Sequence, residues 1–84
     1  MKKSYQNAIN AAKALGFTEP SEPQERRNPY TGKTHKLVPL AVLLYDFITT
    51  RKFVCGKDYT RQTWDNARYC FCTTWPDAYY DLLD

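Results

Sequence analysis

The chain has 84 residues, a formal net charge of +3 and 15% aromatic residues, the size of one small domain. Residues 1–37 carry seven Lys or Arg and three Glu, whereas residues 38–84 carry five Lys or Arg and six Asp. This mild imbalance is much weaker than the basic surface of a dedicated nucleic-acid-binding domain.

The first part of the chain predicts a helix over residues 4–15. Ser4 suits the N-cap position. Apolar side chains recur at helical spacing on one face: Tyr5, Ala8, Ile9, Ala12 and Leu15. Gly16 then suits the left-handed residue that follows a helix, and we expect Phe17 to pack back against Ala12.

Residues 18–36 are polar, charged and interrupted by three prolines, which predicts a long loop outside the helical core. The five residues Asn28-Pro29-Tyr30-Thr31-Gly32 predict an ordered turn within this loop. Asn28 can hydrogen-bond to the backbone ahead of it, Pro29 fixes its own φ, and Gly32 tolerates a positive φ. The loop should therefore have an ordered tip.

The most apolar stretch is Leu37–Ile48, in which Asp46 is the one charged residue. Pro39 suits the first position of a helix, where its missing N–H costs nothing. We expect a helix over residues 39–51 that is covered on nearly every side. It is too short to cross a bilayer, which needs roughly 20 apolar residues.

Two further helices are expected after Cys55-Gly56, which should end the central segment, and Asp58, which should cap the next one. The predicted inner face of the third helix comprises Thr60, Thr63, Trp64, Ala67, Cys70 and Phe71. Residues 69–75 favour β-structure, so a strand remains an alternative there. Pro76 opens a short last helix. Its expected inward residues are Trp75, Ala78, Tyr79, Leu82 and Leu83.

Together these patterns predict one all-α domain over residues 1–84. Its architecture is a compact bundle of about four helices around the buried helix 39–51, with the long Pro-rich basic loop 18–36 outside. The N-terminal residues lead into a polar stretch and not into an apolar signal sequence, so we expect a cytoplasmic protein.

Three segments resemble small, uncharacterised bacteriophage proteins. The turn 28–32, the helix segment Leu43–Ile48 with its Tyr-Asp-Phe-Ile, and the C-terminal Pro-x-x-Tyr-x-x-Leu-Leu carry the resemblance, which covers roughly residues 28–84. It implies an origin in the cytoplasm of an infected bacterial host, where small inhibitors and adaptors of host machinery are common. It implies no specific activity.

The sequence predicts no enzyme and no cofactor. Gly32-Lys33-Thr34 imitates the end of a P-loop, but Arg27 stands where the first glycine is needed. A zinc site is the alternative for four residues, namely His35, Cys55, Cys70 and Cys72. They lack the paired Cys-x2-Cys spacing, and Cys70 and Cys72 point about 200° apart on a helix. Asp77, Asp81 and Asp84 are expected to form a solvated face.

The basic loop is the best candidate for a binding surface. The residues expected to contact a partner are Arg26, Arg27, Tyr30, Lys33, His35 and Lys36. Arg binds carboxylates and phosphates bidentately, and an exposed Tyr can fill a partner's pocket or stack on a base. We therefore expect a small interaction protein that binds and modulates a host or phage protein, as in host takeover or anti-defence. Nucleic-acid binding through residues 26–36 is the alternative.

Overall fold

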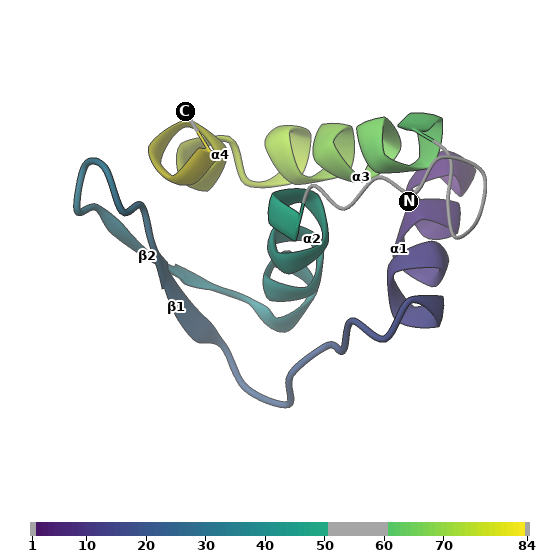
Figure 1. Ribbon diagram of the computed structural model, residues 1–84, viewed down its shortest axis with the longest axis horizontal. Helices are drawn as coiled ribbons and strands as arrows, with labels where there is room; N and C mark the ends of the chain where they lie inside the picture. Colours follow the sequence, from purple (N-terminus) through teal and green to yellow (C-terminus); the bar gives the residue numbers. More distant parts are fainter. Residues whose placement is uncertain (1, 51–60, 84) are drawn as a thin grey trace.

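The computed structural model describes residues 2–50 and 61–83, and these form four helices and one β-hairpin (Figure 1). The elements in chain order are α1 (Lys3–Ala14), β1 (Gln24–Arg27), β2 (Thr34–Leu37), α2 (Pro39–Thr50), α3 (Arg61–Thr74) and α4 (Pro76–Leu83). The four predicted helices are confirmed. The prediction of an all-α fold is wrong, because part of the expected loop 18–36 is a two-stranded antiparallel sheet.

Helix α1 ends as its sequence predicts but begins differently. Gly16 has a φ of 99°. Its N–H donates to the carbonyl of Lys13, and the N–H of Phe17 donates to that of Ala12, both at 3.1 Å, which is the pattern of a Schellman turn. At the other end the helix starts at Lys3, so Ser4 lies within the first turn and the predicted Ser4 cap is wrong.

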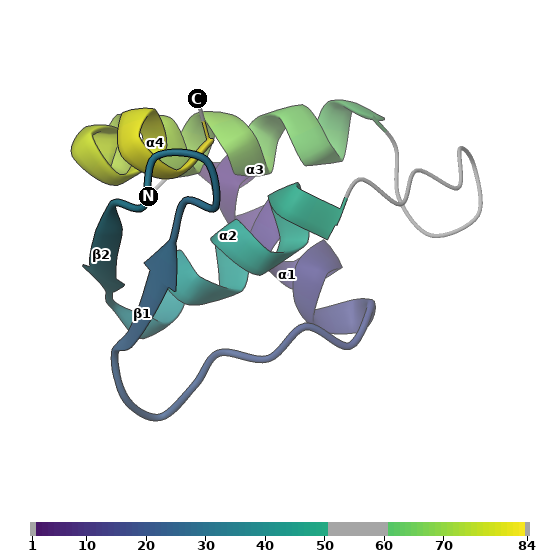
Figure 2. The same ribbon diagram turned by 60° about the vertical axis from the view of Figure 1, so that its left-hand side comes forward.

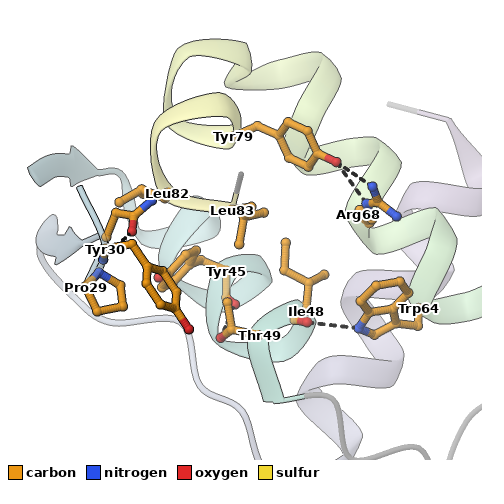
Figure 3. A pocket seen from close by; sticks show the side chains of 11 residues that line it. Pro29, Tyr30, Tyr45, Ile48, Thr49, Trp64, Arg68, Tyr79, Leu82 and Leu83 are labelled. Atoms are coloured by element: carbon orange, nitrogen blue, oxygen red, sulfur yellow. Dashed lines mark hydrogen bonds between the residues drawn. The ribbon is translucent and has the colours of Figure 1, made fainter. Parts of the chain in front are cut away.

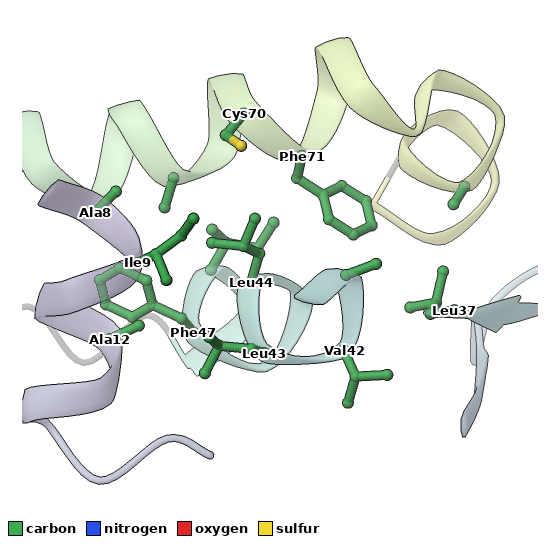
Figure 4. Packing of buried hydrophobic residues seen from close by; sticks show 14 of the residues in the cluster. Ala8, Ile9, Ala12, Leu37, Val42, Leu43, Leu44, Phe47, Cys70 and Phe71 are labelled. Atoms are coloured by element: carbon green, nitrogen blue, oxygen red, sulfur yellow. The ribbon is translucent and has the colours of Figure 1, made fainter. Parts of the chain in front are cut away.

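Helix α2 lies at the centre of the molecule and supplies more of the core than any other described element (Figure 4). It begins at Pro39 as predicted. Six of its residues are buried: Ala41, Val42, Leu43, Leu44, Phe47 and Ile48. Helices α1 and α3 pack against it and against each other, and the Phe17 ring lies 5.7 Å from that of Phe47. A helix this apolar needs cover from several neighbours, and the fold provides it.

Helices α3 and α4 follow one another closely. Residues 69–74 belong to α3, so the helical interpretation of that stretch is confirmed over the strand alternative. Pro76 is the first residue of α4 as predicted, and Ala78 and Leu82 face the core. The predicted end at Cys55-Gly56 and the Asp58 cap lie outside the described residues, as do Thr60 and Arg51. None of the described helices combines the length and the apolar content that crossing a membrane requires.

The hairpin lies beside α2, with its tip close to α4 (Figure 2). Its register pairs Gln24 with Leu37 and Arg27 with Thr34. Only Leu37 of the eight strand residues is buried, where β2 runs into the core. A strand pair with so few apolar residues depends on contacts from the helices to hold its position.

Candidate functional site

Asn28 organises the hairpin tip. Its N–H donates to the carbonyl of Lys33, and its own carbonyl accepts from the N–H of Gly32, both at 2.9 Å. Its side-chain oxygen accepts the N–H groups of Tyr30 and Thr31 at 2.8 and 3.3 Å. Gly32 has a φ of 75°, a conformation that glycine adopts without strain. The predicted turn is confirmed.

The same residue fastens the tip to α4. Asn28 is 2% exposed, and its side-chain nitrogen donates to the backbone carbonyl of Asp81 at 2.8 Å. A buried amide with every group hydrogen-bonded holds its surroundings in one arrangement, since moving it would strand polar atoms away from water. The tip is thus a fixed part of the molecule.

Asp81 also receives two side chains from the hairpin. His35 Nε2 lies 2.6 Å from Asp81 Oδ2, and Lys33 Nζ lies 3.4 Å from Asp81 Oδ1. The hydrogen bond with His35, and then the contact with Lys33, lowers the pKa of Asp81 below its ordinary value. The expectation that Asp81 belongs to a simple solvated face is wrong, because it ties the hairpin to α4.

Arg26 makes the matching connection to α2. Its Nε and Nη2 donate to the two carboxylate oxygens of Asp46 at 3.2 and 3.1 Å. These hydrogen bonds raise the pKa of Arg26, against the opposing effect of partial burial. Asp46, the lone charge of the apolar stretch, is therefore the α2 anchor of the hairpin.

The six predicted partner-binding residues thus divide into two groups. Arg26, Lys33 and His35 contact carboxylates of the same chain. Among the residues that the structure describes, Arg27 and Lys36 make no ion pair, and both are exposed. Tyr30 is 95% exposed at the tip. The hairpin does not present all six side chains together as one basic surface.

A groove of about 520 Å³ lies between the hairpin tip and the three last helices (Figure 3). Its lining is rich in aromatic side chains from four elements: Tyr30 at the tip, Tyr45 on α2, Trp64 on α3 and Tyr79 on α4. Ile48 and Leu83 add apolar surface between them (Figure 3). Of the described residues that line it, only Arg68 carries a charge.

Polar and aromatic contacts hold the side chains of α3 and α4 that line the groove. Arg68 Nε and Nη2 donate to the hydroxyl of Tyr79 at 2.9 and 2.7 Å. The same guanidinium lies 5.9 Å from the centre of the Trp64 ring and 5.8 Å from that of Tyr79. Trp64 Nε1 donates to the carbonyl of Ile48 at 3.1 Å. These contacts hold both large rings in defined orientations.

The sequence reasoning missed four of these residues: Tyr45, Trp64, Arg68 and Tyr79. The sequence predicts their helices, but it places Trp64 and Tyr79 on core faces and gives no site role to Tyr45 or Arg68. A usable signal was present, because Trp64 and Arg68 are four residues apart on one helix and therefore neighbours on its surface. The meeting of α3, α4 and the hairpin tip requires the tertiary structure.

The two described cysteines, Cys70 and Cys72, do not form a metal-binding group with His35. His35 is engaged by Asp81, and Cys55 lies outside the described residues. Cys70 is buried in the core, and burial raises the pKa of its thiol, which favours the protonated form at neutral pH. Within residues 2–50 and 61–83, no group of three or more His, Cys, Asp or Glu residues lies close enough to hold a metal ion.

Comparison of this chain with protein-family models, with curated proteins and with solved structures found no match in any of the three.

Proposed function

We propose that this chain is a non-enzymatic protein-binding module and that the groove between the hairpin tip and helices α2, α3 and α4 is its docking site. The observation that carries the proposal is the lining of that groove, which combines Tyr30, Tyr45, Trp64 and Tyr79 with Arg68. Tyr, Trp and Arg are the residues most enriched among the energetically dominant contacts of protein interfaces.

The rigidity of the site supports the same conclusion. Asn28 fixes the tip that carries Tyr30, and Arg68 fixes the rings of Trp64 and Tyr79. A site whose side chains are already ordered loses little conformational entropy on binding, which strengthens affinity. The bacteriophage resemblance points to a host or phage protein as the partner, which the module would modulate or inhibit by covering part of its surface.

Nucleic-acid binding has less support. Arg26 pairs with Asp46 and Lys33 with Asp81, so these two hairpin cations are already partly neutralised within the chain, and His35 is hydrogen-bonded to Asp81. Affinity for nucleic acid depends on basic side chains that remain to neutralise phosphates. The groove itself offers aromatic surface with a single charged lining residue among those described.

The test compares two exposed tyrosines of the same chain. Tyr30→Ala alters the groove, whereas Tyr69→Ala removes a ring that is 66% exposed on α3 and does not line it. Immobilised wild type should capture a protein in stoichiometric amount from bacterial lysate, before and after nuclease treatment. With the captured protein purified, Tyr30→Ala should weaken binding about 30-fold and Tyr69→Ala by less than about threefold.

Three results would contradict the proposal. They are the absence of a stoichiometric protein partner, loss of capture after nuclease treatment, and equal losses for the two variants. Because Tyr30 is almost fully exposed, its replacement leaves the core intact, so a loss of binding reports on the groove and not on folding.

A further inference from the structure

We propose that strand β1 pairs edge to edge with β1 of a second copy of this chain, in antiparallel orientation. The contact would use the side of β1 that faces away from β2, and no residue of β1 lines the groove, so the inference goes beyond the proposed function. It rests on the hydrogen-bonding direction of β1 and on the order of its charges.

The hairpin register determines which backbone groups point outward. The N–H of Asn28 donates to the carbonyl of Lys33 across the hairpin. Arg26, two residues before Asn28, is opposite His35. Bonded and non-bonded pairs alternate in an antiparallel ladder. The N–H and C=O groups of Glu25 and Arg27 therefore point away from β2.

These outward groups are open to a second strand. Among the described residues, no backbone group outside the hairpin bonds to Glu25 or Arg27. The carbonyl of Glu25 accepts one bond, from Nη1 of Arg26 at 3.0 Å, and a carbonyl has room for a second. Pro23, at the next outward position, has no N–H and limits the pairing to a short segment.

The charges of β1 select its own sequence as the partner. Glu25 and Arg27 are exposed and lie on the strand face opposite the Arg26–Asp46 pair. An antiparallel copy centred on Arg26 places each Glu25 opposite Arg27 of the other copy. This register forms four backbone hydrogen bonds and two pairs of opposite charge, whereas registers centred on Glu25 or on Arg27 place like charges together.

The centre of this register places the two Arg26 side chains opposite each other. Each is already hydrogen-bonded to Asp46 of its own chain, which offsets the repulsion between them. Charged residues on an edge strand usually prevent indiscriminate pairing. In β1, the order of Glu25 and Arg27 matches the charges of a second, antiparallel copy of the same strand.

Because the contact is short, we expect a weak dimer. Exchanging the charges at positions 25 and 27 tests the proposed register. Sedimentation equilibrium of the full chain from about 10 µM to about 1 mM should show dimers that increase with concentration. Glu25→Arg and Arg27→Glu should each weaken dimerisation roughly tenfold, because each places like charges opposite one another. The double variant Glu25→Arg/Arg27→Glu restores both pairs with reversed signs and should dimerise like wild type.

Amide hydrogen exchange measures directly whether the backbone N–H groups of β1 are protected in the dimer. In the dimer, the N–H groups of Glu25 and Arg27 should become protected as concentration rises, while that of Arg26, which faces β2, changes little. A wild-type chain that stays monomeric over the whole range overturns the proposal. So does a double variant that remains as weak as the single ones, or dimerisation without protection of these two amides. Groove binding is unaffected by any of these outcomes.

Discussion

Asn28 shows how one side chain can set the position of a whole surface. It hydrogen-bonds forward to Tyr30 and Thr31 and across to Asp81 of α4. The turn and its attachment therefore depend on the same buried amide. The forward bonds follow from the local sequence, whereas the bond to a residue 53 positions away does not.

Replacing Asn28 by Ala should lower the free energy of unfolding by about 1–3 kcal/mol, because two turn N–H groups and a carbonyl of α4 lose their partner. Urea unfolding followed by tryptophan fluorescence measures the change. Asn7→Ala, at an exposed position of α1, is the matched control and should change stability by no more than about 0.5 kcal/mol. Equal effects of the two variants would show that the Asn28 network contributes nothing.

At the scale of single elements, the helices were predictable and the strands were not. The apolar residues of α1 recur at helical spacing, α2 is a nearly continuous apolar run, and Pro39, Gly16 and Pro76 mark helix ends for steric reasons. The strands read Gln-Glu-Arg-Arg and Thr-His-Lys-Leu, which show neither β-branched enrichment nor an apolar alternation. Their side chains contact Asp46 and Asp81, which are distant in sequence, and a local pattern cannot show such contacts.

The attachment of the hairpin to α4 should be sensitive to acid. Contacts with His35 and Lys33 lower the pKa of Asp81 in the folded state. A group whose folded pKa is lowered stabilises the fold above its ordinary pKa, near 4, and loses that contribution as pH falls through the lowered value. The difference in unfolding free energy between wild type and Asp81→Asn should therefore be largest above about pH 5 and vanish in strong acid.

Denaturant unfolding from pH 7 down to about pH 2 measures this difference. Asp77→Asn provides the control, since Asp77 is on the same helix, exposed, and in no ion pair among the described residues. Its difference from wild type should vary less over the same range. A difference for Asp81→Asn that stays constant with pH would mean that its carboxylate charge is irrelevant to the hairpin.

At the scale of the whole molecule, the groove was the feature least accessible to sequence reasoning. Its four rings come from the hairpin tip and three helices: Tyr30 is almost fully exposed, and the other three each resemble an ordinary half-buried aromatic residue. Apart from Tyr30, the predicted site residues are basic side chains, and three of them, Arg26, Lys33 and His35, contact carboxylates of the same chain. The sequence shows which residues are charged, but it does not show which of them form ion pairs within the folded chain.

The four helices and β2 all contribute side chains to the core built on α2, so the molecule should unfold as one unit. The radius of gyration is 12.3 Å, close to the roughly 12 Å expected of a compact domain with 84 residues. Leu44 is fully buried in this core, and Leu44→Ala should lower the unfolding free energy by about 2–5 kcal/mol. Val38→Ala, at a position 46% exposed beside the same helix, should cost no more than about 0.5 kcal/mol.

Because α1, α3 and the hairpin all pack against α2, Leu44→Ala should shift every structural probe together. Helical circular dichroism and the fluorescence of Trp64 and Trp75 should report one transition, with its midpoint moved to lower denaturant by the same amount. Separate midpoints would show that the hairpin and α4 unfold independently of α1 and α2. In that case the groove would lie at a boundary between two units, and its walls would not be held by the common core.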